Sequence, residues 1–382
     1  MNQLKNSLLI IIVITSCFLL SGCTNPKENL ENYYYVMAIG IDSTTEGNIN
    51  LSVQIASNSN QSSSDKETSQ SSTSNIYTVP CYSIDSGLTI LNNYLSKKLN
   101  LSHCSAIIFS EEIAKKGIKN YINSLGNNLE IRPTCNIIIS STTGLDALET
   151  ISNSNEQFTS KFYEFIKNSA KYTGYSINPE LSEFFYCINM RTSPAIATYA
   201  TISNKAIQNT GIAIFDDDKF LSDLTVLDSM SYSLIANRLE GATLTIKNPY
   251  DLSELIDVEI EQVKKPSISC YLINNYPYIK INLYLEYSLL SSSYSIDTKT
   301  ISGNKHLKNA INSYIQEMVL SFLYETSHKY NIDLCNFRNI ISSNYLTLDE
   351  FNKIHWEEIY KDSHFTVNIH GEITDLGIFS NE

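Results

Sequence analysis

The sequence predicts an α+β (mixed α/β) fold with three domains, each a mixed or antiparallel sheet covered by helices. Stretches with alternating apolar residues, typical of half-buried strands, are interleaved with stretches whose apolar residues recur every three or four positions, typical of amphipathic helices. The chain has 382 residues, of which 42% are hydrophobic and 18% charged. This composition is that of a globular protein, and the length exceeds what one typical core needs.

Residues 1–22 predict a lipoprotein signal peptide. Lys5 precedes an uncharged apolar run from Leu8 to Leu20, which is too short to span a bilayer as a permanent helix. The run ends in Leu20-Ser21-Gly22-Cys23, which resembles the lipobox of bacterial lipoproteins. We expect the mature chain to begin at Cys23, with acyl chains on this residue holding the protein outside the cytoplasmic membrane. The alternatives are a buried core segment and a plain signal with a chance cysteine.

Residues 23–32 are expected to form a lipid-anchored tether that is short enough to keep the first domain close to the membrane. Tyr33 to Tyr35 follow the tether directly. Aromatic rings suit membrane interfaces, so these tyrosines are candidates for a contact near the membrane. Burial of all three in the first strand is an equally good interpretation.

The N-terminal domain is expected over residues 33–195. Alternation predicts strands over 35–41 and 49–55, and residues 57–75, rich in Ser and Asn, predict a flexible loop. Helical spacing follows over 84–95, then a buried strand over 106–109. Two short helices are expected on either side of Gly117, followed by a strand over 134–140 and a mainly helical stretch from Leu145 to about Met190.

A β-rich middle domain is expected over residues 196–264. Strands over 206–215 and 220–226 flank Asp216-Asp217-Asp218-Lys219, which predicts a hairpin turn. Three aspartates could hold a cation, but the alternating ligands, glycine and final glutamate of a calcium loop are missing. A helix over 230–239 and a strand over 251–263 complete this domain.

The C-terminal domain, residues 265–382, is expected to combine a sheet with a long helix. Residues 279–287 alternate more regularly than any other stretch of the chain, and apolar residues from Leu307 to Leu323 form one helical stripe. We expect this helix to lie across the sheet, because the exposed sheet needs a cover. Short helices around Trp356 and a final strand over 365–369 follow.

Charge and cysteine content exclude some classes of protein. The 40 acidic and 27 basic residues give a formal net charge of −13, which argues against nucleic-acid binding and against binding anionic lipid by surface charge. The even number of cysteines downstream of Cys23 permits disulfides, but no spacing pairs them, and we expect small core residues. They are Cys81, Cys104, Cys135, Cys187, Cys270 and Cys335.

The sequence predicts no catalytic, cofactor-binding or metal-binding residue. It has no nucleophile elbow, phosphate-binding loop, dinucleotide fingerprint or zinc-protease motif. His103, His364 and His370 are scattered beside apolar stretches, where a structural hydrogen bond is more common than a metal ligand. We therefore expect a protein that is not an enzyme and needs no cofactor.

An ordered series of short segments resembles a known family. After Cys23 come residues 37–42 (Met-Ala-Ile-Gly-Ile-Asp), 101–103 (Leu-Ser-His), 113–118 (Ile-Ala-Lys-Lys-Gly-Ile), 130–132 (Glu-Ile-Arg), 209–215 (Asn-Thr-Gly-Ile-Ala-Ile-Phe) and a closing segment from Trp356 to Gly377. This series resembles the Ger(x)C lipoproteins, the C subunits of bacterial spore germinant receptors. Two departures are Thr24-Asn25 where the family commonly has Trp-Asp, and the long Ser/Asn-rich loop.

The resemblance implies a three-domain lipoprotein on the outer face of the inner spore membrane, assembled with integral-membrane A and B subunits and needed for spore germination. It argues against direct nutrient binding by this chain. Among the matching residues, Gly40 and Gly211 would allow a bulge or close backbone approach. Asp42 would cap the following turn, and His103 and Arg132 would make stabilising hydrogen bonds.

A solute-binding lipoprotein that captures a small nutrient outside the membrane is the alternative function. It would have two lobes and a deep pocket between them.

Overall fold

A computed structural model describes residues 30–45, 47–56, 75–153, 170–191, 193–291 and 301–375, and Asn6 alone in the N-terminal segment. Within this part of the chain, strands form two sheets covered by helices, which confirms the predicted α+β class. The predicted signal peptide, Cys23 and nearly all of the Ser/Asn-rich loop 57–75 lie outside the described residues.

The larger sheet runs in the order β3-β2-β1-β5-β6-β7-β8-β9, with β4 paired to β1. Its centre is parallel, because β1, β5, β6 and β7 pair in parallel, whereas both flanks are antiparallel. The strands are β1 (Tyr33–Ser43), β2 (Ile49–Ile55), β3 (Asn75–Cys81), β4 (Lys98–Asn100), β5 (Ala106–Ser110), β6 (Asn136–Ser140), β7 (Ile196–Ser203), β8 (Ala206–Asp216) and β9 (Lys219–Leu224).

Helices cover both faces of this sheet, so its central strands are buried on both sides. One face packs against α2 (Ile84–Tyr94), α3 (Glu111–Lys116), α4 (Lys119–Asn127) and α7 (Leu181–Met190), and the other against α5 (Gly144–Asn153). Ile107 of β5 belongs to the first core and Ile108 to the second, as expected when successive side chains point to opposite faces. As predicted, Gly117, with φ 110°, separates α3 from α4.

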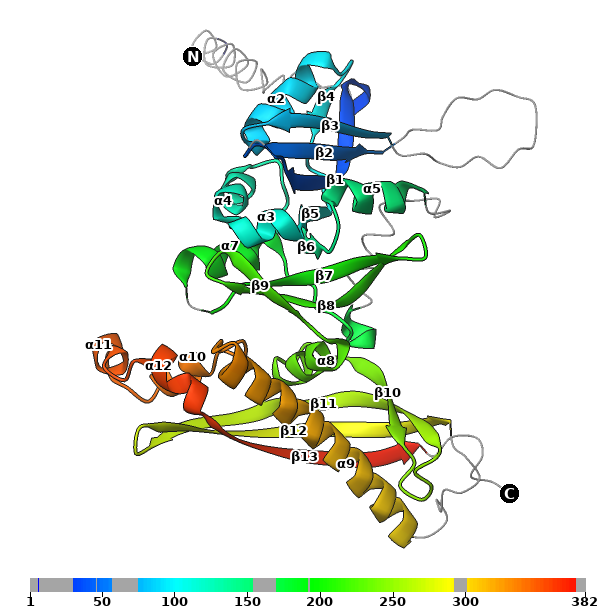
Figure 1. Cartoon of the computed structure of the whole chain (residues 1–382), viewed down its shortest axis with the longest axis vertical. Coiled ribbons are helices and arrows are strands. Elements are labelled where there is room, and N and C mark those ends of the chain that lie inside the picture. The colour runs from blue at the N-terminus through cyan, green and yellow to red at the C-terminus, as the bar shows by residue number, and fades with distance from the viewer. Residues whose placement is uncertain are drawn as a thin grey trace, which may run out of the picture.

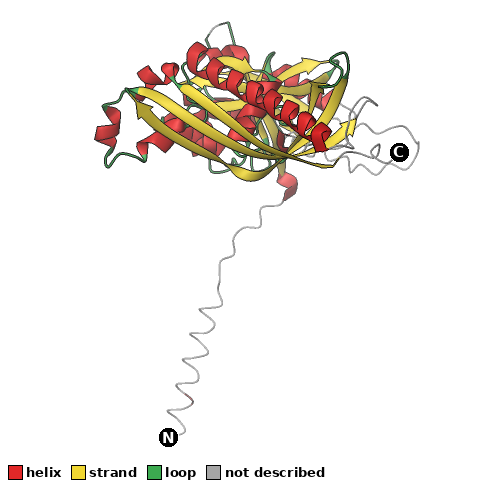
Figure 2. Cartoon of the chain, turned by 90° about the horizontal axis from the view of Figure 1, so that it is seen from below, coloured by secondary structure: helices red, strands yellow, loops and turns green. Residues whose placement is uncertain are grey.

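The second sheet has the order β10-β11-β12-β13, formed by β10 (Gly241–Lys247), β11 (Leu255–Ile273), β12 (Tyr276–Ser291) and β13 (His364–Asp375). The predicted alternation along β12 is confirmed, since the odd-numbered residues from Ile279 to Leu289 are buried. Helix α9 (Ile301–Tyr324) lies across this sheet (Figure 2), and Leu307, Ile311 and Phe322 of its predicted stripe are fully buried.

Helix α8 (Val226–Ile235) lies between the two sheets (Figure 1). Every residue from Asp228 to Ile235 is buried, and Leu234 belongs to a core that joins Ile212 of β8 to Ile281 of β12. A helix buried all round must satisfy its polar side chains internally. The Oγ atoms of Ser229 and Ser231 donate to backbone carbonyls one turn earlier, each at 2.8 Å.

The C-terminal part also contains η2 (Glu325–Lys329), α10 (Phe337–Ser342), α11 (Leu348–Asn352), α12 (Trp356–Ile359) and η3 (Tyr360–Asp362), and η1 (Leu30–Asn32) precedes β1. The six cysteines in the described part of the chain form no disulfides with one another. Four of the six, Cys81, Cys104, Cys135 and Cys270, are buried in the core.

None of the helices in the described part of the chain combines the length and hydropathy that crossing a bilayer requires.

The predicted domain boundaries differ from the strand pairing at two places. Strands β7, β8 and β9 of the predicted middle domain continue the large sheet through the parallel pairing of β6 with β7. The predicted boundary between residues 264 and 265 lies inside β11. Strands of the predicted middle domain are therefore divided between the two sheets, because alternation predicts which side chains are buried but not which strand is the neighbour. The three-domain division stays a prediction.

Candidate functional site

The predicted lipid-anchor residue, Cys23, lies outside the described residues, and the continuously described chain begins at Leu30, within the expected tether of residues 23–32. Tyr33, Tyr34 and Tyr35 start β1 and are each half-buried. The Tyr34 hydroxyl lies 3.0 Å from the Ser96 Oγ. Burial of the three tyrosines in the first strand is therefore partial, and a contact of these rings near the membrane stays a prediction.

The histidines that the sequence singled out lie apart and contact aromatic rings. His103 packs edge-on against Tyr35 with ring centroids 4.9 Å apart, and His370 stacks on Tyr284 at 5.0 Å. His364 stacks on Tyr278 at 4.8 Å. Among the described residues, no three His, Cys, Asp or Glu side chains gather as a metal site would require.

The Asp216–Lys219 segment is a tight turn between β8 and β9, as predicted. Asp217 has a left-handed φ of 54° and forms an ion pair with Arg191, whose Nη2 lies 2.9 Å from the carboxylate. The Asp218 carboxylate accepts from the backbone N–H of Lys119 at 3.1 Å, at the start of α4. Asp217 therefore bonds to the C-cap residue of α7, and Asp218 bonds to the residue that begins α4.

The expectation that Asp42 caps the turn after β1 is wrong. Its carboxylate accepts from the backbone N–H groups of Gly144 and Leu145 at 2.6 and 3.0 Å, so it caps the start of α5. Burial raises the pKa of Asp42, against the opposing effect of these hydrogen bonds. The turn after β1 has the nearest backbone N–H groups in the sequence. The close approach of β1 and α5 instead brings donors that lie about a hundred residues away.

Gly40 and Gly211 confirm the predicted need for missing side chains. A Cβ on Gly40 would lie 3.0 Å from the Gly144 carbonyl carbon, so the missing side chains of Gly40 and Gly144 allow α5 to approach β1. A Cβ on Gly211 would lie 1.9 Å from the Leu224 carbonyl oxygen of β9. The β7–β8 register shifts next to Gly211, between Tyr199 and Ala200, which is the predicted bulge.

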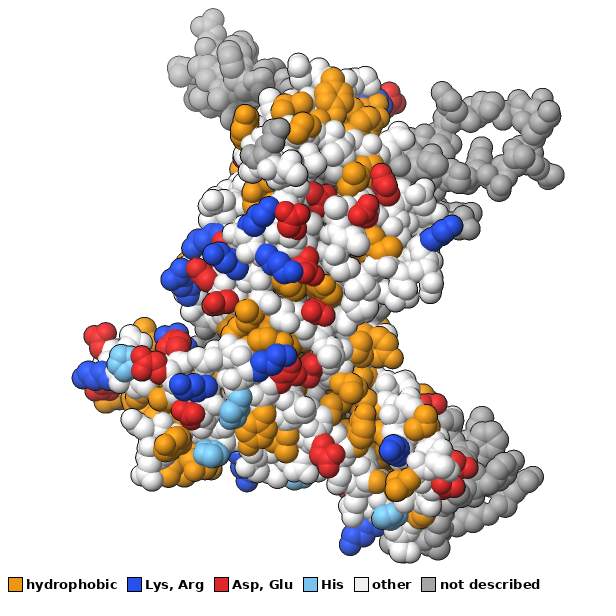
Figure 3. Space-filling model, in the orientation of Figure 1, with side chains coloured by type: hydrophobic (Ala, Val, Ile, Leu, Met, Phe, Trp, Pro, Cys, Tyr) orange, Lys and Arg blue, Asp and Glu red, His pale blue; other side chains and the backbone are white. Residues whose placement is uncertain are grey.

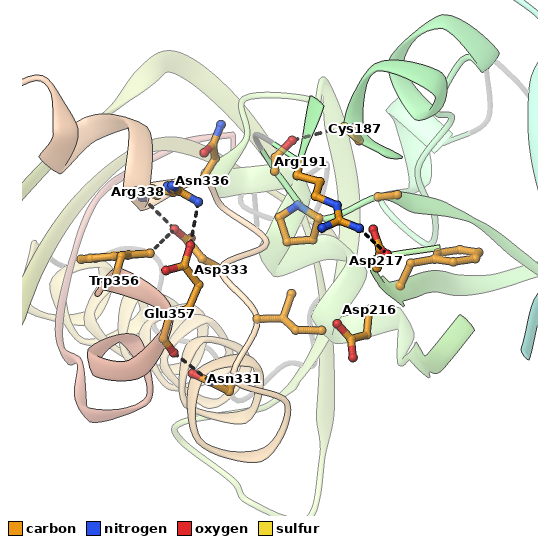
Figure 4. A pocket seen from close by; sticks show the side chains of 15 residues that line it. Cys187, Arg191, Asp216, Asp217, Asn331, Asp333, Asn336, Arg338, Trp356 and Glu357 are labelled. Atoms are coloured by element: carbon orange, nitrogen blue, oxygen red, sulfur yellow. Dashed lines mark hydrogen bonds and ion pairs between the residues drawn. The ribbon is translucent and has the colours of Figure 1, made fainter. Parts of the chain in front are cut away.

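A cavity of about 320 Å³ lies where the large sheet meets the C-terminal helices (Figure 4). One wall comes from the end of α7, the segment after it and the β8–β9 turn. The other comes from the segment around α10 and the start of α12. Its volume falls in the range of small-molecule sites, so this cavity is the candidate binding site of the described chain.

Asp333 organises the C-terminal wall of the cavity. Its carboxylate accepts from the backbone N–H groups of Phe337 and Arg338 at 2.9 and 2.7 Å, and from the Trp356 indole N–H at 3.1 Å (Figure 4). The residue keeps part of its surface open, yet its carboxylate lies among protein atoms, and this burial raises the pKa of Asp333 to about 6. The donors only partly offset that cost.

Two arginines face the cavity from opposite walls, and each is paired with a carboxylate. Arg191 pairs with Asp217, and Arg338 pairs with Glu357 at 2.6 Å (Figure 4). The buried Oδ1 of Asn336, on the cavity wall, has no hydrogen-bond partner among the described residues. The cavity therefore offers charged groups of both signs to a small polar ligand.

The described lining lacks the parts of a nucleophilic site. Cys187 lies 3.2 Å from the Ser193 Oγ, but burial raises the pKa of its thiol, which disfavours the reactive thiolate. No histidine from the described part of the chain lines the cavity. Within the described lining of this cavity, no residue is therefore assigned the role of an activated nucleophile.

Sequence reasoning singled out Asp216, Asp217 and Trp356 but did not predict the cavity. Its lining comes from the segments 187–195, 215–217, 331–338 and 356–357, which no spacing motif connects. The free Asn336 acceptor and the raised pKa of Asp333 arise only from packing, so no signal in the sequence could have found them.

Comparisons with known proteins give similarities over almost the whole described chain. Residues 26–201 match the family described as "Spore germination protein N-terminal domain", and residues 210–377 match "Spore germination B3/ GerAC like, C-terminal". Spore germination protein KC of Bacillus subtilis (strain 168) is 20% identical, over 94% of this chain and 92% of that protein. The crystal structure of the GerBC protein superposes with a TM-score of 0.58 at 15% identity, covering 88% of this chain and 97% of that one, which shows a shared fold.

Proposed function

The chain belongs to the GerAC-like family of spore germination proteins, and from this premise we propose that it is a lipid-anchored, non-enzymatic C subunit of a nutrient germinant receptor. The observation that carries the proposal is the match of both family domains, in order, over residues 26–377. The similarity begins three residues after Cys23, the expected anchor.

The proposed subunit assembles with integral-membrane A and B subunits on the outer face of the inner spore membrane. Attachment through acyl chains on Cys23 confines the folded body near these partners, which raises its effective concentration at them. No catalytic step is assigned, because the described lining of the cavity lacks a nucleophile paired with a base.

The test is germination of spores that lack this chain, in a strain without other germinant receptors. Wild-type complementation should restore nutrient-triggered germination, and Cys23→Ala should restore much less of it. Cys17→Ala is the matched control, because Cys17 lies inside the predicted signal, before the cleavage point, and should behave as wild type. Normal germination of spores lacking the chain would contradict the receptor role.

Assembly requires a separate measurement. Affinity purification of the wild-type chain from detergent-solubilised spore membranes should recover the A and B subunits. Recovery of neither subunit, from membranes shown to contain both, would contradict assembly while leaving a role in germination intact.

A solute-binding function is the second candidate, favoured by the cavity of about 320 Å³ and by the arginines, Arg191 and Arg338, on its two walls. A nutrient that binds only the folded chain should raise its thermal midpoint as the nutrient concentration rises. Arg191→Ala should reduce that shift if the cavity is the site, because Arg191 lines it and its side chain is 68% exposed. No shift with any nutrient of a germinant panel would remove this candidate.

A further inference from the structure

Helix α2 carries apolar side chains on its outer side as well as on its inner side. Ile84, Leu88 and Leu91 are buried against the large sheet. Ile90 and Tyr94 are 42% and 54% exposed, and Tyr82, just before the helix, is 85% exposed. Ile90 and Tyr94 are four positions apart and therefore share one side of the helix.

Helix α2 adjoins the point where the chain enters the fold. Strand β1 begins at Tyr33 and pairs in parallel with β4, which follows α2 after three residues. The side-chain carbonyl of Asn92 in α2 accepts from the Leu99 N–H at 2.8 Å, and the Lys97 ammonium lies over the Tyr34 ring at 5.5 Å. We use the name α2 face for the side chains Tyr34, Tyr82, Ile90, Tyr94, Lys97 and Lys98, which lie on α2, just before it, and at the β1–β4 entry beside it.

The α2 face lies at one end of an elongated molecule. Figure 1 shows α2 and β4 at the top, with the second sheet at the bottom. Figure 3 shows hydrophobic side chains gathered over the α2 end. Other exposed apolar side chains, Tyr271, Ile273 and Tyr276, lie around the β11–β12 turn of the second sheet, in the other half of the molecule.

Chain length selects between these two apolar surfaces. Cys23 precedes Leu30 by seven residues, which span at most about 25 Å when fully extended. An acylated Cys23 therefore keeps the α2 end within reach of the bilayer, whereas the β11–β12 turn is held away from it by the length of the molecule.

The residue types of the α2 face match the chemistry of a membrane interface. Tyrosine rings place an apolar body and a polar tip at the headgroup level, and lysine reaches phosphate while its stem stays on apolar surface. Glu31 precedes by two residues Tyr33, the residue of β1 that pairs with Lys98, and it offsets one of the two lysine charges at this entry. Burial of apolar groups, rather than charge, must then provide most of the contact.

We propose that the α2 face rests in the headgroup region of the phospholipid bilayer, with Ile90 and Tyr94 at the boundary with the acyl chains. The inference rests on the proposed anchoring at Cys23 and deepens it by fixing which side of the protein faces the lipid. The orientation leaves the cavity and the second sheet pointing away from the membrane.

Tryptophan quenching by brominated lipids tests this orientation. The chain has one tryptophan, Trp356, which is buried in the C-terminal part and gives a constant background. The full-length, lipid-modified Tyr94→Trp protein is reconstituted into vesicles of phosphatidylglycerol and phosphatidylethanolamine with or without brominated acyl chains. The matched control is Leu346→Trp, at a 95% exposed position between α10 and α11, far from α2 in Figure 1.

Brominated vesicles should remove about half of the emission that the Tyr94→Trp substitution adds, because an interfacial apolar side chain reaches about 5–10 Å into the bilayer. They should leave the emission that the Leu346→Trp substitution adds unchanged. Equal or absent quenching in the two variants would overturn the α2-face proposal. Because the vesicles contain no partner protein, absent quenching would leave the A or B subunit as the occupant to test next, whereas equal quenching would mean that the protein has no preferred side toward the lipid.

Vesicle flotation separates failure of this proposal from failure of the anchor. Wild-type chain should float with the vesicles and Cys23→Ala should stay behind. If wild type does not float, the anchor itself is contradicted. If wild type floats but the Tyr94→Trp variant shows no added quenching, the anchor stands and the α2 face is wrong. Ile90→Trp, with its fold checked by circular dichroism, replaces Tyr94→Trp if the latter does not fold.

Discussion

Asp42 joins two segments that lie about a hundred residues apart. It is 5% exposed and accepts from two backbone N–H groups at the start of α5. A carboxylate at this position accepts from N–H groups that have no partner within the helix. Its negative charge also interacts favourably with the positive end of the helix dipole.

Asp42→Ala should lower the free energy of unfolding by about 2 kcal/mol, because two amide groups are left without their acceptor. Glu149→Ala is the matched control, since Glu149 is an exposed carboxylate in the same helix. Urea unfolding followed by far-UV circular dichroism measures both. Equal losses in the two variants would show that burial of the Asp42 carboxylate is unimportant.

Asp333 makes the free energy of unfolding depend on pH, and the direction of its pKa shift fixes the sign of that dependence. Its pKa in the folded protein, about 6, lies above the ordinary value of 3.8, so the folded state holds the proton more tightly than the unfolded state. The stabilisation from this group is complete below about pH 4, falls as the pH rises to about 6, and is absent above that. The folded and unfolded pKa values of Asp333 differ by about two, which corresponds to about 3 kcal/mol in the free energy of unfolding.

The measurement is the difference in free energy of unfolding between wild type and Asp333→Asn from pH 4 to 7. Trp356 reports it directly, because its indole donates to Asp333. The wild-type advantage should shrink by about 3 kcal/mol over this range, since the asparagine does not titrate. A difference that stays constant with pH would contradict the raised pKa.

At the scale of single elements, the sequence predicted periodic segments accurately. The stripe of α9 and the alternation of β12 emerged with the expected faces buried, because each pattern is set by local geometry alone. Gly211 shows what such patterns leave out. It lies inside a strand, and its role depends on the neighbouring β9, whose Leu224 carbonyl occupies the space of a side chain.

Gly211→Ala should destabilise the chain by about 3 kcal/mol or more, because the new Cβ cannot fit without moving β9. Gly241→Ala tests the same change at the start of β10, where the nearest atom would lie 3.7 Å away, and should cost less than about 0.5 kcal/mol. The measurement is the thermal unfolding midpoint of each purified variant, compared with that of wild type. A Gly211→Ala protein as stable as wild type would mean that β9 shifts at little cost.

At the scale of the whole molecule, α8 couples the two sheets. One hydrophobic core extends from β8 through α8 to β12 and α9, and the Arg238–Glu183 ion pair adds a polar link from the segment after α8 to α7. Because removing α8 would expose apolar surface of both sheets, the sheets should unfold together.

Leu234→Ala should therefore lower both the Trp356 fluorescence midpoint and the far-UV circular dichroism midpoint in urea, with a loss of about 3 kcal/mol. Ile122→Ala, in the separate core of the large sheet, is the comparison. If Leu234→Ala moves only one of the two signals, the sheets unfold independently and the shared core does not couple them.

The sequence by itself determined the kinds of element, the buried face of most of them, the expected anchor at Cys23 and the family resemblance. These follow from local periodicity and from ordered short motifs, which depend on neighbours in the chain. Only the tertiary structure decided that β7 joins β6, that Asp42 caps α5, that a cavity forms beside Asp333, and that α2 carries its exposed apolar side next to the chain entry. Each of these is a contact between distant segments, and the pattern of one segment carries no record of which other segment completes it.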